Sequence, residues 1–151
     1  MNIFIFGATG QVGRLTAAAA LQASHSITAT GRHIDVLKPL AGEGQLRIHQ
    51  CDVTKPSEVA NALDSASSSE PIDAVVCTFG APVNKGTVLS PPDICDRGIA
   101  QVIEAMKNRS LDRLICMTAI GVGNSQGHGT WMFRHAIRPL MLGRIFKDRE
   151  N

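Results

Sequence analysis

Three glycines recur at intervals of three near the start of the chain, in the segment GATGQVG at residues 7–13. The segment lies between a short apolar run at residues 2–6 and a helical pattern that begins at Gln11. In this context Gly7 permits a tight turn, Gly10 lets the backbone approach a diphosphate, and Gly13 lets the helix pack against the strand. A glycine turn that binds nothing is the alternative, but the position between strand and helix favours phosphate binding.

The chemistry expected of this loop is anion binding by backbone N–H groups at the start of a helix, aided by the positive end of the helix dipole. Glycine loops of this kind bind the diphosphate of a dinucleotide. The predicted contacts come from the loop and the first helical residues: Gly7, Thr9, Gly10, Gln11, Val12 and Gly13.

The residues after the second apolar run distinguish between the two nicotinamide cofactors. Proteins that prefer NAD usually place Asp or Glu there, because a carboxylate accepts hydrogen bonds from the ribose 2′-hydroxyl. This chain has Thr30-Gly31-Arg32 instead, and no acid occurs before Asp35. A guanidinium binds a 2′-phosphate that a carboxylate would repel. We therefore predict NADP as the preferred cofactor, with Arg32 as its phosphate ligand and Arg14 as a second candidate; a surface arginine without a ligand is the alternative.

Alternating strand and helix patterns must position these residues. Short β-rich runs are predicted at residues 2–6, 25–31, 45–51, 72–79 and 113–118. Helical patterns fall between and after them, at 11–23, 34–37, from 54, from 90 and at 131–146. In the first helix the apolar face is expected to comprise Val12, Leu15, Ala19 and Ala23. This alternation predicts a Rossmann-type α/β fold, a doubly wound parallel sheet of about five strands in a single domain over residues 1–151.

The composition is that of a soluble globular domain and argues against several classes of protein. Of 151 residues 44% are hydrophobic, and the formal net charge of +2 argues against nucleic-acid binding by bulk charge. The four cysteines form no CxxC pair, which is typical of a reduced, intracellular protein. No apolar run is long enough to span a membrane, and the first strand lacks the flanks of a signal peptide. We therefore expect a cytoplasmic protein that contacts neither membrane nor nucleic acid.

The GATGxxG pattern at residues 7–13 resembles the short-chain dehydrogenase/reductase superfamily. Within it, the chain is similar to the atypical NAD(P)H-binding members, the NmrA-like group and the biliverdin reductase B/flavin reductase group, from Met1 to about Lys147. Weaker support comes from CDV at 51–53 and MTAIG at 117–121. The resemblance implies an NAD(P)-binding Rossmann domain that acts on, or responds to, a small molecule.

The resemblance also implies contacts beyond the glycine loop. Asp52, followed by Val53, is expected to accept a hydrogen bond from the adenine amino group; a turn residue at the start of the next helix is the alternative. The fourth strand ends at Thr78, Phe79 and Gly80, at the edge where open α/β sheets bind ligands. Gly80 would let the backbone approach the adenine-side ribose, whereas Phe79 could equally belong to the core.

Catalysis cannot use the phenolic acid of the tyrosine-dependent superfamily members, because the chain contains no tyrosine. Thr118 occupies the position where many relatives carry a catalytic serine, and it either orients the substrate or serves only the strand end. His128, in a glycine-rich loop, is a candidate proton donor, although a solvated loop histidine is the commoner case. Direct hydride transfer to a flavin, a quinone or a linear tetrapyrrole needs no phenol, since an extended π-system delocalises the charge.

Three functions remain open at this point. The first is an NADPH-dependent oxidoreductase acting on a conjugated acceptor, and the second is a non-catalytic NADP-binding regulator or assembly factor of the NmrA-like type. The third, a sugar-nucleotide epimerase relative, is disfavoured by the absence of tyrosine. Relatives continue through further strands, so the C-terminal part is expected to be truncated or minimal. The fifth strand would then be an exposed sheet edge, paired with a second copy in a homodimer or covered by residues 131–147.

Overall fold

A computed structural model describes residues 1–42, 45–80 and 93–118 of the chain. The chain divides into two compact units, one formed by Met1–Phe79 with Gly98–Met117 and the other by Gly80–Arg97 with Thr118–Asn151. The first unit contains the sheet. His128 and the helical pattern predicted at 131–146 lie outside the described residues, and the single domain over 1–151 stays a prediction.

Five parallel strands form one sheet in the order β3-β2-β1-β4-β5. The strands are β1 (Asn2–Phe6), β2 (Ser26–Gly31), β3 (Leu46–Gln50), β4 (Ala74–Cys77) and β5 (Leu114–Cys116). The helices that the structure describes are α1 (Gln11–Gln22), the 3-10 helix η1 (Ile34–Gly42), α2 (Pro56–Ser67) and α4 (Ile94–Lys107). This arrangement confirms the predicted Rossmann-type doubly wound sheet.

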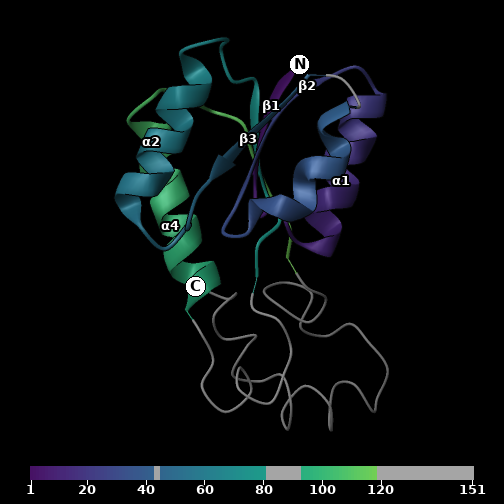
Figure 1. Ribbon diagram of the computed structural model, residues 1–151. Coiled ribbons are helices and arrows are strands. Elements are labelled where there is room, and N and C mark those ends of the chain that lie inside the picture. Colours follow the sequence, from purple (N-terminus) through teal and green to yellow (C-terminus); the bar gives the residue numbers. More distant parts are fainter. Residues whose placement is uncertain (43–44, 81–92, 119–151) are drawn as a thin grey trace, which may run out of the picture. The chain divides into compact units, whose positions relative to one another are not determined.

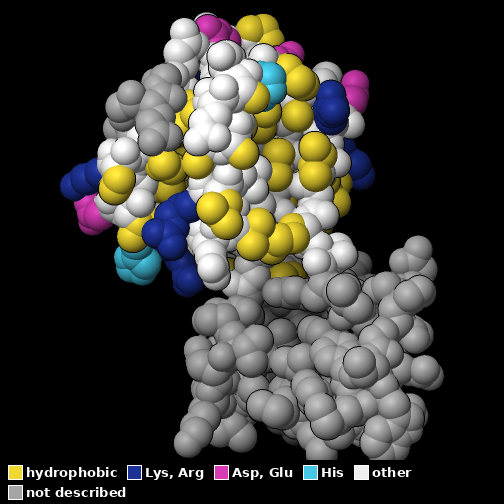
Figure 2. Space-filling model, turned by 90° about the vertical axis from the view of Figure 1, so that its right-hand side faces the viewer, with side chains coloured by type: hydrophobic (Ala, Val, Ile, Leu, Met, Phe, Trp, Pro, Cys, Tyr) yellow, Lys and Arg dark blue, Asp and Glu magenta, His cyan; other side chains and the backbone are white. Residues whose placement is uncertain are grey.

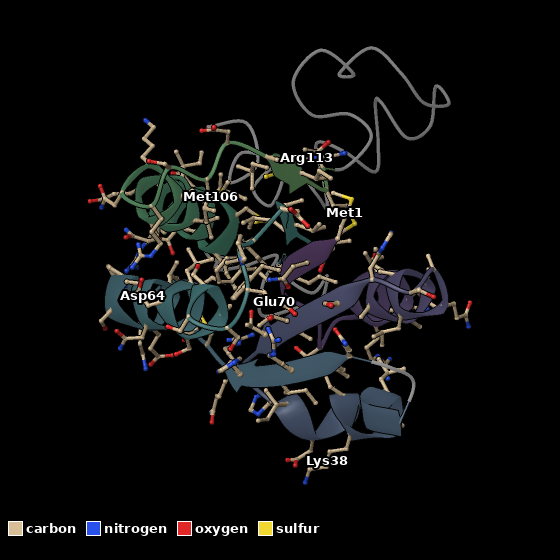
Figure 3. The ribbon with its side chains drawn as sticks, turned by 90° about the horizontal axis from the view of Figure 1, so that it is seen from above. Met1, Lys38, Asp64, Glu70, Met106 and Arg113 are labelled. Atoms are coloured by element: carbon tan, nitrogen blue, oxygen red, sulfur yellow. The ribbon has the colours of Figure 1, made fainter. Side chains whose placement is uncertain are left out.

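Helices cover both faces of the sheet, with α2 and α4 on one side and α1 on the other (Figure 1). Seen from above, α2, which carries Asp64, lies beside α4, which carries Met106 (Figure 3). The guanidinium of Arg109, just after α4, donates to both oxygens of the Asp64 carboxylate at 2.7 and 2.8 Å. This paired hydrogen bond joins the two helices on their shared face of the sheet.

The central strand β1 is buried on both faces, which explains its continuous apolar sequence. Phe4 and Phe6 lie on one face, fully buried, with ring centroids 4.7 Å apart. Ile5 lies on the other face, in a cluster with buried residues of α1, β2 and η1. The other members of this cluster are Ala8, Ala17, Leu21, Ile27, Ala29 and Leu37.

The apolar face predicted for α1 was wrong, because Val12, Leu15, Ala19 and Ala23 are all exposed. The residues that α1 buries are Gly13, Ala17 and Leu21, spaced by four. A glycine and an alanine let the helix approach the sheet closely, so small residues mark its buried face better than large ones. Hydrophobic side chains are consequently exposed on the side of the molecule that carries α1 (Figure 2).

The direction of the strand order reverses at β1, with β2 and β3 on one side and β4 and β5 on the other. In open α/β sheets ligands bind at such a reversal, beyond the carboxyl ends of the strands. The segment that follows β1 at this place is the glycine loop. The fold therefore positions the predicted diphosphate site where this sheet architecture places its ligands.

β5 ends the sheet in the described part of the chain, as predicted for the fifth strand. Its Ile115 is 49% exposed. Pairing of this edge with a second copy, or its coverage by residues 131–147, stays a prediction. Among the described residues no helix is both long and apolar enough to cross a membrane.

Candidate nucleotide-binding site

The turn after β1 requires glycine at residue 7. Gly7 has a φ of +80°, and a Cβ there would lie 2.6 Å from the backbone nitrogen of Phe79. The turn is held by two backbone hydrogen bonds, from Ala8 N to Thr30 O at 2.8 Å and from Gly10 N to Gly7 O at 3.1 Å. Both the backbone conformation and the close approach of Phe79, just after β4, therefore exclude a side chain at this position.

Gly13 permits the close contact of α1 with this turn, as its sequence position predicts. A Cβ at Gly13 would collide with the carbonyl oxygen of Gly7 and would lie 2.7 Å from Ala8 Cα. The same Cβ would lie 2.7 Å from the hydroxyl of Thr78. Two of these three neighbours are backbone atoms, and moving them to make room for a side chain would distort the turn.

Gly10 differs from the other two glycines, because packing within the described part of the chain does not require it. Its φ of −72° and ψ of 166° suit any residue, and among the described residues a Cβ there would meet only the Gly7 carbonyl oxygen, at 3.4 Å. Gly10 is exposed, as are Gln11 and Val12 after it. The backbone at this point is thus open to a molecule from outside, which is the space that a diphosphate would need.

The cap and first turn of α1 contain no acidic side chain that would neutralise the helix dipole. Gly10 provides no side-chain cap, and the first turn contains no acidic residue. The first helical hydrogen bond runs from Arg14 N to Gly10 O at 3.0 Å, so the N–H groups of Gln11, Val12 and Gly13 precede the helical ladder. α2 contrasts with this, since Glu58 lies in its first turn. An anion at the start of α1 would supply the missing negative charge.

The carboxyl end of β2 lies beside the glycine loop. A Cβ at Gly31 would overlap the side chain of Thr9, so this glycine lets the loop pack directly on the strand end. Arg32 follows and is exposed, and its carbonyl accepts a hydrogen bond from Gln50 Nε2 at 3.2 Å. Sequence reasoning missed the contact of Gly31 with Thr9, although a glycine at the end of a strand that contains β-branched residues was the available signal.

Asp52 forms the turn that leads from β3 into α2. Its Oδ1 accepts hydrogen bonds from Thr54 N at 3.0 Å and Thr54 Oγ1 at 2.8 Å, and its own N–H donates to Glu58 Oε2 at 2.8 Å. The Thr54 hydrogen bonds, and then the charges of Arg32 and Lys55, hold the pKa of the Asp52 carboxyl below its usual value. Asp52 thus has the geometry of a turn residue, and its contact with adenine stays a prediction.

Thr78 stabilises the glycine loop through hydrogen bonds to its backbone. Its buried hydroxyl donates toward the carbonyl oxygens of Phe6 at 3.1 Å and Gly7 at 3.2 Å. The hydroxyl proton is therefore used within the chain, and the predicted contact of Thr78 with a cofactor stays a prediction.

Phe79 and Val53 share a neighbour that sequence reasoning missed, Gly98 of α4. A Cβ at Gly98 would lie 2.7 Å from Phe79 Cε2 and 3.0 Å from Val53 Cγ2. A glycine inside an amphipathic helix was the available signal. The other two predicted residues near this strand edge, Gly80 and Thr118, belong to the second unit, where Gly80 is half-buried and Thr118 is exposed.

Comparison with known proteins agrees with this geometry. The family model described as NAD(P)H-binding matches residues 7–150. The chain belongs to this family. The nicotinamide cofactor of this family fits the structure, because the backbone at Gly10 is exposed and can be approached by a ligand. The described residues include no cluster of side chains that could hold a metal ion.

Solved structures of similar fold include reductases and an epimerase-like protein. The anaerobillin reductase ChuY from Escherichia coli O157:H7 matches with a TM-score of 0.70 and 22% identity over 99% of this chain and 64% of its own. A short-chain type dehydrogenase/reductase from Mycobacterium marinum matches with a TM-score of 0.67 and 26% identity over 80% of this chain and 56% of its own. A putative NAD-dependent epimerase/dehydratase from Bacillus halodurans matches with a TM-score of 0.64 and 21% identity, covering 94% and 62%. The chain thus spans less than two thirds of these proteins.

Proposed function

We propose that this chain binds NADPH and transfers its hydride to a flavin, a quinone or a similar conjugated acceptor. The observation that supports cofactor binding most strongly is the difference among the three loop glycines. Gly7 and Gly13 are required by contacts inside the chain, whereas Gly10 is exposed and has room for a side chain that it does not carry. A bound diphosphate explains why this position lacks a side chain.

A preference for NADPH follows from the charge at the end of β2. Arg32 is exposed there and is the first charged residue after the strand. In the proposed complex its guanidinium binds the 2′-phosphate, and Arg14, also exposed, is the second candidate. NADH lacks this phosphate and would gain nothing from either arginine.

The adenine is proposed to lie near Asp52, Val53 and Phe79, beyond the carboxyl ends of β3 and β4. The side chains of Val53 and Phe79 both pack against Gly98, where there is no side chain to separate them. This packing supports an apolar surface at this edge of the sheet. Gly80, next in the chain, is proposed to leave room for the adenine-side ribose.

The reaction itself is hydride donation by the reduced nicotinamide. The chain contributes the diphosphate-binding N–H groups, the charge of Arg32 and the orientation of the cofactor. Thr118 and His128 are the proposed groups for orienting the acceptor and supplying a proton, with water as the alternative proton source. ChuY, named as an anaerobillin reductase, supports a conjugated acceptor only as an analogy of fold.

A non-catalytic NADP-binding regulator is the second candidate, and the absence of tyrosine favours it. Oxidation of NADPH in the presence of FMN, FAD and quinones separates the two functions. Turnover supports the reductase, whereas tight NADPH binding without turnover of any of these acceptors supports the regulator.

The cofactor preference is tested by reversing the charge of Arg32. Each hydrogen bond to a charged group contributes about 1.5–3 kcal/mol, so Arg32→Glu should weaken NADPH binding about tenfold to a hundredfold. NADH binding should change far less. Lys107→Glu, at the far end of α4, changes the net charge equally and should leave both affinities unaltered. Equal loss of NADPH and NADH binding in Arg32→Glu would refute the assignment.

A further inference from the structure

Two cysteines occupy directly paired positions at the carboxyl end of the sheet. Cys77, the last residue of β4, pairs in register with Cys116, the last residue of β5. In-register residues of neighbouring parallel strands project to the same face, and the strands lie about 4.7–4.9 Å apart. This separation falls within the Cα distances of about 4.4–6.8 Å that disulfides span.

The two thiols have different surroundings. Cys77 is buried and Cys116 is exposed. The carbonyl of Cys77 accepts a hydrogen bond from Met117 N at 2.9 Å, which fixes the end of β5 against β4. One sulfur is therefore open to a reagent from solution, and the other lies behind it in the sheet.

A hydrogen bond between the side chains further distinguishes them. It lowers the pKa of Cys116 to about 7. The same hydrogen bond, together with burial, raises the pKa of Cys77. Cys51 provides an internal contrast, because burial and then the charges of Glu58 and Asp52 raise its pKa to about 12. Reactivity of a cysteine follows its thiolate fraction, so we expect Cys116 to react faster than Cys51.

We propose that Cys77 and Cys116 are a two-cysteine modification site that hydrogen peroxide oxidises reversibly to an intramolecular disulfide. The Cys116 thiolate attacks the peroxide, the O–O bond breaks, and the sulfur becomes a sulfenic acid while hydroxide leaves as water after protonation. The sulfur of Cys77 then attacks the Cys116 sulfur, forming the S–S bond and breaking the S–O bond. The Cys77 proton leaves with the released hydroxide as a second water. The two sulfurs lose two electrons in total, and the peroxide gains them.

The bridge would join the last residues of β4 and β5 at the carboxyl edge of the sheet. The bridge would also lie next to Thr78, whose hydroxyl supports the glycine loop. The site does not depend on the proposed reductase activity.

The test is treatment of the reduced full-length chain with a small molar excess of hydrogen peroxide, followed by alkylation and peptide mapping. We expect two of the four thiols to be lost, a linked peptide pair containing Cys77 and Cys116, and full recovery of both thiols with dithiothreitol. Cys116→Ser should abolish the loss of thiols. Cys51→Ala, the matched control, should form the same linked pair.

A second probe works on the wild-type chain and needs no variant. Phenylarsine oxide bridges two neighbouring thiols, so prior binding of this arsenical should protect the chain from peroxide and from alkylation at both cysteines. Oxidation of Cys116 alone to sulfinic acid, a linked pair that includes another cysteine, or unchanged thiols after peroxide would each overturn the proposal.

Discussion

The different roles of the loop glycines predict different results for two substitutions. Gly10→Ala should lower cofactor affinity with little change in stability, whereas Gly13→Ala should lower the stability of the chain itself. At Gly10 the added methyl meets one oxygen among the described residues, at 3.4 Å, in a backbone conformation that alanine adopts. Alanine is a poorer N-cap than glycine by roughly 1 kcal/mol. Alanine also reduces the conformational entropy of the unfolded chain, which stabilises the folded state by about 0.4–1 kcal/mol. The free energy of unfolding should therefore change by less than about 1 kcal/mol.

At Gly13 the methyl collides with backbone atoms of Gly7 and Ala8. Overpacking of this kind costs about 1–3 kcal/mol, and for a chain of this size each kcal/mol corresponds to about 2–4 °C in Tm. Gly13→Ala should lower the Tm of the cofactor-free chain by several degrees, measured by thermal unfolding.

Cofactor affinity, by contrast, should fall in Gly10→Ala although the stability of this variant is nearly unchanged. In Gly10→Ala the methyl occupies the approach of the diphosphate, and loss of one hydrogen bond to a charged group costs about 1.5–3 kcal/mol. NADPH affinity measured by calorimetry should fall at least about tenfold, while the Tm stays near that of the wild type. Wild-type affinity in Gly10→Ala would refute the role of this glycine, and a large fall in its Tm would refute the geometry on which the reasoning depends.

Three further predictions concern the surroundings of the loop. Thr78→Val should lower the free energy of unfolding by about 1 kcal/mol and weaken NADPH binding, because the loop loses the hydrogen bonds of the Thr78 hydroxyl. Thr78→Ser, which keeps the hydroxyl, should retain both properties. Equal stability and affinity in the two variants would contradict this role of the hydroxyl. Gly98→Ala should destabilise the chain in denaturant unfolding despite the better helix propensity of alanine, since its methyl would lie 2.7 Å from the Phe79 ring; a more stable variant would contradict the contact. Alkylation of Cys116 by iodoacetamide should rise with pH through a midpoint near its pKa of about 7 while Cys51 stays unreactive; a midpoint near the ordinary thiol value would show that the hydrogen bond with Cys77 is absent.

The fold and the geometry of the glycine loop were predictable because their signals are local. The apolar run at 2–6 and the spacing of Gly7, Gly10 and Gly13 identify the strand, the turn and the helix in order. The alternation of strands and helices then predicts a doubly wound parallel sheet, and the structure confirms it.

What sequence reasoning missed depends on contacts between distant segments. The residues around Gly98 do not predict its contact with Phe79, and those around Cys77 do not predict its pairing with Cys116. These residues become neighbours only when the sheet and α4 assemble. The face of α1 was mispredicted for a related reason. Large side chains usually mark a buried face, but here the close approach of helix and strand selects Gly13 and Ala17.

The most direct test of the account is an NADPH titration of the isotopically labelled chain followed by backbone amide NMR. The account predicts that the largest shift changes occur at the amides of Gly10, Gln11, Val12 and Gly13, with a further change at Arg32 that NADH does not reproduce. Saturable binding with shift changes elsewhere in the chain, or no change at these amides at any NADPH concentration, would contradict it.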